Sequence, residues 1–211
     1  MWKLLIVLGL LPVVVGVLTR NWLGRRFFNA LGEVKVGSSA STLAKRLTKG
    51  AALKLRVDEG KRFQLAESQL LLPVDAGPSR EVRDVAEACL LAGLAMLARR
   101  QPQLPEWRQR ALKFSWAFPA FTLLVVIFAF VVAKLPLMPA IAIVVLSIGL
   151  GTSAGLVAGW VEWQAAGMVG KLTEARAIFT REDDRQLILK AMKALAAEKA
   201  LPGFLSKFFR S

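Results

Sequence analysis

Three stretches of the chain are long and almost uninterruptedly apolar. They cover residues 4–18, 114–133 and 139–161, and the last two contain no formally charged side chain. A helix that crosses the hydrocarbon core of a bilayer needs about 20 apolar residues. The two later stretches reach this length, and Trp2 and Lys3 lengthen the first because both side chains suit the membrane interface. The pattern predicts three transmembrane helices.

The first stretch has two interpretations, an uncleaved anchor or a cleaved signal peptide. A signal peptide ends in a small-x-small cleavage pattern. None follows Leu18, and the next charged residues are Arg20, Arg25 and Arg26. Because such cations hold the end of a span in the cytoplasm, we expect residues 1–19 to be an N-terminal transmembrane anchor.

The second and third stretches predict a transmembrane helical hairpin over residues 114–161. Only residues 134–138 separate them, with Pro136 inside this short turn. Small residues in the third stretch, among them Gly151, Gly155 and Gly159, permit close contact with another helix. The same glycines also fit the higher glycine content of membrane helices in general, and the pattern does not separate these interpretations.

The cations set an orientation for the three spans. The chain has 29 Lys and Arg against 15 Asp and Glu, which gives a net charge of +14. Of these 29 cations, 18 lie in residues 19–113 and 9 lie in residues 162–211. Loops rich in Lys and Arg stay on the cytoplasmic side. We therefore expect a multi-pass protein with its N-terminus outside and most of its polar segments in the cytoplasm.

The central segment, residues 20–113, predicts a small α+β cytoplasmic domain. Alternation over residues 54–57 and an apolar run over 69–73 favour strands. A helix is expected over 80–99, with Ser79 as N-cap, and its uncharged half, residues 88–98, is too short to span a bilayer and indicates a buried helix. The fold class is therefore a mainly α membrane protein with an α+β cytoplasmic domain.

The C-terminal segment, residues 162–211, predicts two cytoplasmic helices, over about 162–177 and 185–199, followed by a basic tail. The tail combines aromatic and cationic side chains, namely Phe204, Lys207, Phe208 and Arg210. Such a segment suits a surface of anionic lipid headgroups. A chain end that contacts its own protein is the alternative.

The residue types exclude most catalytic sites. The chain has no histidine and only one cysteine, Cys89. No Ser-His-Asp triad, His-ligated metal or Cys-rich zinc site can form. Cys89 lies in an apolar run, and we expect it to be a small buried residue. Glu81, Asp84 and Glu87 alternate with arginines, which is typical of a solvated helix face.

Nucleotide and nucleic-acid binding find no support in the sequence. No glycine-rich phosphate loop occurs, and no aromatic-basic RNA motif is present. Membrane topology accounts for the scattered cations, so we expect no nucleic-acid partner and no cofactor.

Glu162 is the one charged residue that requires a separate explanation. It follows the third apolar stretch directly, with apolar residues around it. A carboxylate at membrane depth is costly and is a functional candidate by default. Either Glu162 is buried or contacts a partner, together with the neighbouring Trp163, or it reaches the headgroup region.

The order of these motifs resembles the YugP-type neutral zinc metallopeptidases, bacterial membrane proteins with an HExxH helix. Residues 20–29 (RNWLGRRFFN) are similar to the basic segment after the family's first span, and residues 37–47 (GSSASTLAKRL) to its next helix. Residues 70–73 (LLLP) match its strand before the active helix, although its acidic D-H-Y-D-P stretch has no counterpart. Residues 85–96 (VAEACLLAGLAM) resemble its V-x-x-A-A-H-E-x-G-H-A-I, and residues 161–166 (VEWQAA) its V-E-F-N/D-A-S.

The resemblance implies a metallopeptidase-like fold in the bacterial cytoplasmic (inner) membrane, but with a degenerate metal site. The two zinc-binding histidines fall on Leu90 and Leu94, and the catalytic glutamate falls on Leu91. Glu162 occupies the position expected of the third ligand. Leucine has no lone pair for zinc and cannot activate water, so we expect no metal and no peptidase activity.

Three functions follow as hypotheses. The first is a catalytically inactive homologue that acts as a structural or regulatory subunit of a membrane complex and pairs with an active homologue or another membrane protein. The second is a metal-dependent peptidase whose ligands are unidentified or come from a partner chain. The third is a membrane-surface adaptor that binds anionic lipid through its tail.

Overall fold

The computed structural model describes residues 2–32, 34–49, 54–58, 64–66, 69–73 and 75–198. The helices are α1 (Trp2–Thr19), α2 (Arg26–Leu31), α3 (Ala40–Thr48), α4 (Val82–Arg100), α5 (Gln103–Val132), α6 (Leu137–Ala175) and α7 (Glu182–Glu198), with a π-helix, η1 (Arg20–Arg25), between α1 and α2. The strands are β1 (Lys54–Asp58), β2 (Gln64–Ala66) and β3 (Gln69–Pro73).

Three helices of the described chain are long and apolar enough to cross a membrane. They are α5, α6 and the continuous helical segment from Trp2 to Leu31. The prediction of a mainly helical protein with three candidate spans is therefore confirmed.

The boundaries of the last two spans differ from the prediction. Helix α5 begins at Gln103 rather than near 114, and α6 continues without interruption through Glu162 to Ala175. The helix expected over about 162–177 is present through Ala175, but as the continuation of α6 and not as a helix that begins at 162. The apolar run ends near 161, but polar residues such as Gln164 and Lys171 are good helix formers, so the backbone hydrogen bonds continue past the last apolar residue.

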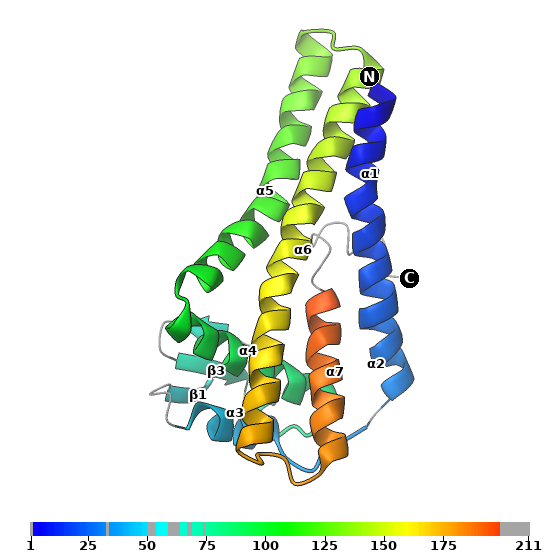
Figure 1. The fold of residues 1–211 in the computed structure, drawn as a ribbon. Coiled ribbons are helices and arrows are strands. Elements are labelled where there is room, and N and C mark those ends of the chain that lie inside the picture. Colours follow the sequence, from blue (N-terminus) through cyan, green and yellow to red (C-terminus); the bar gives the residue numbers. More distant parts are fainter. Residues whose placement is uncertain are drawn as a thin grey trace. The chain divides into compact units, whose positions relative to one another are not determined.

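The chain folds as two compact units. Within the described residues, the first unit comprises 2–23, 106–159 and 197–198, and the second comprises 24–105 and 160–196. Figure 1 shows α1 beside the part of α6 that belongs to the first unit.

Glycine allows the helices of the first unit to approach each other closely. A Cβ atom added to Gly9 of α1 would lie 2.7 Å from the carbonyl oxygen of Val145 in α6, and one added to Gly149 would collide with the Gly9 backbone. A Cβ on Gly151 would lie 2.8 Å from the carbonyl oxygen of Ser115 in α5. Of the two interpretations of these glycines, close helix contact agrees with the structure at Gly149 and Gly151, where the contacts lie within this chain.

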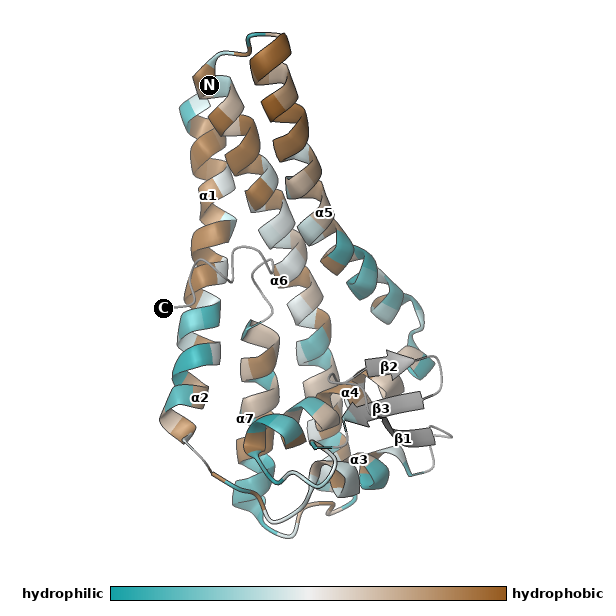
Figure 2. Ribbon diagram, turned by 180° about the vertical axis from the view of Figure 1, so that it is seen from behind, coloured by the Kyte–Doolittle hydropathy of each residue, from teal (hydrophilic) through white to brown (hydrophobic). Residues whose placement is uncertain are grey.

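The large apolar side chains of the first unit are mostly exposed. Phe121 is 67% exposed, Leu124 is 66% exposed and Val131 is 70% exposed. Figure 2 shows this apolar character along α1 and most of α5. An apolar surface of this extent suits the hydrocarbon of a membrane rather than water.

The second unit has a closely packed hydrophobic core. It is formed by α3, α4, α7 and the last turns of α6, with Leu43, Leu90, Val169 and Met192 among its fully buried side chains. Helix α3 begins at the N-cap Ser39, whose hydroxyl accepts a hydrogen bond from the Thr42 amide at 3.4 Å.

The three strands form one small sheet in the order β1-β3-β2. Strand β3 pairs in parallel with β1 and antiparallel with β2. Strands β1 and β3 occupy the two segments for which strands were expected. The described core of the second unit is helical, however, so the structure supports a mainly helical class, and the α+β cytoplasmic domain stays a prediction.

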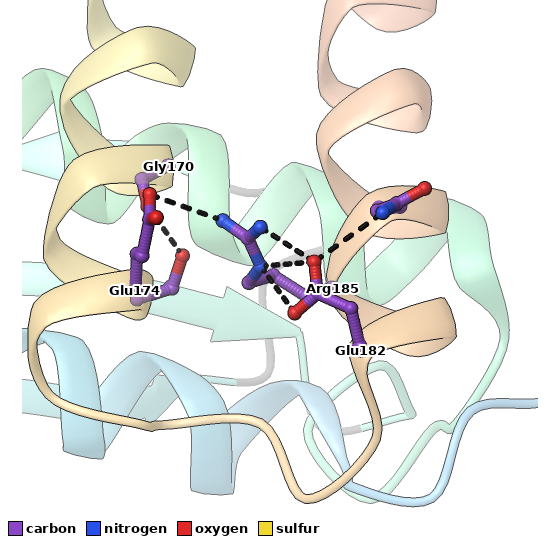
Figure 3. Close-up of polar contacts among 6 residues, drawn as sticks. Gly170, Glu174, Glu182 and Arg185 are labelled. Carbon is purple, nitrogen blue, oxygen red and sulfur yellow. Dashed lines mark hydrogen bonds and ion pairs between the residues drawn. The ribbon is translucent and has the colours of Figure 1, made fainter.

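The turn between α6 and α7 is fixed by polar contacts that Figure 3 shows. The Arg185 side chain is 18% exposed; its Nε donates to both carboxylate oxygens of Glu182, at 3.0 and 2.8 Å, and its Nη1 lies 3.7 Å from a Glu174 oxygen. The hydrogen bond from Arg185 lowers the pKa of the Glu182 carboxyl below its usual range. The last turn of α6 and the first turn of α7 are therefore held together by charge.

Helix α6 is followed by a left-handed residue that is not glycine. Ala177 has φ 45°, and the Ile178 amide donates to the carbonyl of Thr173 at 3.3 Å. This is the pattern of a Schellman cap, in which the left-handed position normally favours glycine.

Candidate functional site

Helix α4, which contains the HExxH-like positions, starts from a defined cap. It begins at Val82 with Glu81 as N-cap in extended conformation, and the Ser79 hydroxyl accepts a hydrogen bond from the Glu81 amide at 3.2 Å. The start expected at Ser79 is therefore two residues too early for the cap. The helix ends at Arg100, close to the predicted end.

Leu90 and Leu94 lie on the buried face of α4. They are four residues apart, so they share one side of the helix, and their exposures are 1% and 2%. Leu91 is half-buried and packs at the margin of the same core. The three positions that the resemblance aligns with the HExxH residues are thus occupied by packed leucine side chains.

Gly93 brings α4 into close contact with α6. A Cβ atom added there would lie 2.7 Å from Cγ2 of Val169 and 2.9 Å from the carbonyl oxygen of Ala165. Only a residue without a side chain fits this approach. The one glycine that this segment shares with the resembled motif is therefore the contact point of the two helices.

Glu162 lies on the face of α6 that packs against α4. It precedes Ala165 by three residues and Val169 by seven, which places all three on one side of the helix. Its side chain is 1% exposed. Of the two interpretations of Glu162, burial within the chain agrees with the structure, and a reach to the surface does not.

Leu90 and Glu162 each lie about one turn before the contact at Gly93, each in its own helix. Gly93 faces Ala165 and Val169, and further along the same pair Arg100 and Arg176 line one cavity. Leu90 precedes Gly93 by three residues in α4, and Glu162 precedes Ala165 by three residues in α6. The structure brings together in one core the segments that the resemblance aligns with the HExxH helix and the third-ligand position.

The side chains that commonly bind metal do not gather in the described part of the chain. Among the described residues, no three His, Cys, Asp or Glu side chains lie close enough to hold a metal ion. Cys89, next to Leu90, is fully buried, and burial raises the pKa of its thiol to about 12. A thiol with this pKa stays protonated at neutral pH and is a poor nucleophile.

The carboxylates at the start of α4 lie on the outer side of the helix or at its margin. Glu81 is exposed, and Asp84 and Glu87 are half-buried. The neighbouring Arg83 guanidinium lies 4.9 Å from the centroid of the Phe28 ring. This agrees with a helix face at the surface of the unit.

The other predicted contact residues differ in their access to a partner. Gly151 and Gly155 are buried within the chain, Gly159 is half-buried, and Trp163 is 41% exposed. Trp163 is the most accessible of these four. The tail residues Phe204, Lys207, Phe208 and Arg210 lie outside the described residues.

One cationic cluster of the second unit did not emerge from the sequence. Lys49, Arg99, Arg100 and Arg176 line a common cavity. Each lies at or next to the end of a helix, a signal that the sequence contains but that helix capping explains on its own. Only the packing of the three helices brings the four cations to one place.

Comparisons of the chain with protein-family models, with curated proteins and with solved structures gave no match. The resemblance to zinc metallopeptidases therefore remains a hypothesis about the fold.

Proposed function

We propose that the chain is a non-catalytic membrane protein with a metallopeptidase-like fold, which serves as a structural or regulatory subunit of a membrane complex. The observation that supports this proposal is the packing of Leu90 and Leu94 into a core to which α6 also contributes, together with the burial of Glu162 on α6. At the positions that the resemblance aligns with HExxH, leucine side chains fill the core where the family has metal-binding side chains.

The energetics favour packing over a vacant metal site. An unfilled polar pocket in a protein interior would leave hydrogen-bonding groups unsatisfied. Each buried leucine side chain instead contributes about 1.5–3 kcal/mol through removal from water. The two fully buried leucines thus stabilise the helix pair without metal, and the fold is retained for binding rather than hydrolysis.

The proposal includes a place in the cell. The cations of residues 19–113 and 162–211 favour a cytoplasmic position for these segments, with the small α+β domain. The resemblance to the metallopeptidases implies that the membrane is a bacterial inner membrane. The exposed Trp163, next to the buried Glu162, is the contact position that we assign to a partner membrane protein.

Zinc analysis tests the non-catalytic part. The full-length protein, purified in detergent without chelator, is expected to hold no stoichiometric zinc by mass spectrometry of the metal. One zinc per chain in the wild type would contradict the proposal and favour the peptidase alternative.

A restored site tests the kinship itself. In L90H/L94H the two imidazoles and Glu162 supply the three protein ligands of a His₂Glu zinc site, and we expect one zinc per chain with thermal stabilisation by the metal. The further change Glu162→Gln should abolish this binding. The control L91H/A95H has the same i, i+4 spacing, but its two imidazoles point in a direction about 100° around α4 from those of L90H/L94H. This pair and Glu162 should therefore not bind zinc together. Two results would refute the proposed likeness to a His₂Glu zinc site. One is equal zinc binding by both histidine pairs, and the other is no zinc binding by L90H/L94H although circular dichroism shows that this variant is folded.

The subunit role requires a partner. Replacement of Trp163 by a photo-crosslinking amino acid, in cells that express the chain at native level, should give a discrete crosslinked species with a second membrane protein. The same amino acid at the exposed Lys193 is the control. A chain that purifies from native membranes alone, without crosslinks at Trp163, would exclude the subunit role.

A further inference from the structure

A cavity of about 260 Å³ opens where three helices of the second unit end. Its lining comes from the end of α3, from the last turns of α4 and from the end of α6. Half of the lining residues are cationic and half are apolar: Lys49, Arg99, Arg100 and Arg176, and Leu47, Met96, Met168 and Leu172.

Helix capping accounts for part of this charge. Each helix C-terminus has the effect of about half a negative charge, so three ends contribute about −1.5. Arg176 serves this purpose directly, because its Nη1 donates to the carbonyl oxygen of Lys49 at the end of α3, at 3.2 Å. Four cations against about −1.5 leave an excess near +2.5, which is more than the helix ends require.

The excess is not neutralised by carboxylates of the lining. In the part of the chain that the structure describes, no Asp or Glu lines the cavity. Glu174, two residues before Arg176, instead lies 3.7 Å from Arg185. Arg99 and Arg100 are exposed, so they can reorient toward an anion that enters.

The combination of cations and apolar side chains defines the chemistry of a ligand. Guanidinium groups match the oxygens of a phosphoryl group through paired, charge-assisted hydrogen bonds. The methionine and leucine side chains suit an alkyl or glycerol portion, and methionine adapts to its shape. We propose that this cavity binds the phosphoryl group of an amphiphilic phosphate ester, either a phospholipid headgroup or a soluble ester.

Three ligands separate the sources, with the full-length protein in non-ionic detergent. Isothermal titration calorimetry is done with short-chain phosphatidylglycerol, with short-chain phosphatidylcholine and with glycerol phosphate. The test variant is R99Q/R100Q, which removes two exposed cations of the lining and leaves the capping Arg176 in place. The matched control is K190Q/K193Q, which removes two exposed cations of α7 that do not line the cavity.

We expect phosphatidylglycerol to bind at least about tenfold more weakly to R99Q/R100Q than to the wild type, and K190Q/K193Q to bind within about twofold of the wild type. Binding of glycerol phosphate as well would assign a soluble ester, and binding of phosphatidylglycerol alone would assign a lipid headgroup. Equal binding of phosphatidylcholine and phosphatidylglycerol, no binding of either anionic ligand, or an equal loss in both variants would overturn the proposal. Circular dichroism of both variants shows that each is folded.

Discussion

The two units of this chain use apolar residues in opposite ways. In the first unit, Leu124 and Phe121 are about two-thirds exposed, and the helices meet where glycines remove side chains. In the second unit, Leu90 and Leu94 are almost fully buried, and large side chains fill the core. A leucine therefore marks a surface for lipid in one unit and the packed interior in the other, so hydropathy alone does not identify the core of a membrane protein.

The strongest test of this difference is one substitution made in both units. Leu90→Ala should lower the free energy of unfolding by about 3 kcal/mol, because it leaves a cavity in a packed core. Leu124→Ala should change it by less than about 0.5 kcal/mol, as for an exposed position. Denaturant titration in detergent micelles, followed by circular dichroism, gives both values. Equal losses would show that the exposed face of α5 is covered by protein.

The contact of α4 and α6 at Gly93 gives the next largest effect. Gly93→Val should destabilise the second unit by about 2 kcal/mol, since its side chain would overlap with Ala165 and Val169. Gly167 lies between Ala165 and Val169 on α6, and a Cβ atom added there would meet no atom within 4 Å. Gly167→Ala should therefore stabilise the helix, by about 1 kcal/mol, through helix propensity alone. The same denaturant titration measures both changes, and a tolerated valine at position 93 would mean that the two helices are further apart.

The cap of α6 predicts a smaller, stabilising change. Ala177→Gly should raise the free energy of unfolding by about 0.5–1 kcal/mol, because glycine adopts the positive φ without steric cost. Ala175→Gly, within the last helical turn, is the control and should lower stability by up to about 1 kcal/mol. A lower free energy of unfolding in both variants would argue against the left-handed conformation of Ala177.

The smallest effect concerns pH and the contact of Arg185 with Glu182. Because the folded-state pKa of Glu182 is lowered, its contribution to stability is present above the unfolded pKa and is lost as pH falls through the folded pKa. Acid titration of the unfolding midpoint below about pH 4.5 should therefore show a shallower slope for Glu182→Gln than for the wild type. The change is small because Glu182 is exposed, and added salt should reduce it further. Asp183→Asn is the matched control, and an equal slope change there would exclude the pairing as the cause.

Much of the helical framework could be predicted from the sequence. The three apolar stretches, the turn after residue 133 and the buried half of α4 each depend on local composition. The unbroken course of α6 through Glu162 could not, because a helix continues wherever backbone hydrogen bonds are satisfied, irrespective of where apolar residues stop. The change in composition near residue 161 marks a change of surroundings and not a helix end.

What the sequence alone determined is a list of chemical possibilities: no histidine for a metal or a triad, a single thiol, an apolar run over residues 88–98 and an excess of cations. The tertiary structure decided which residues meet. Leu90 and Glu162 are far apart in the chain, and only the close approach at Gly93 places their helices in one core. The cations at three helix ends also converge only through packing, because charge and hydropathy are local properties while distance across a fold is not.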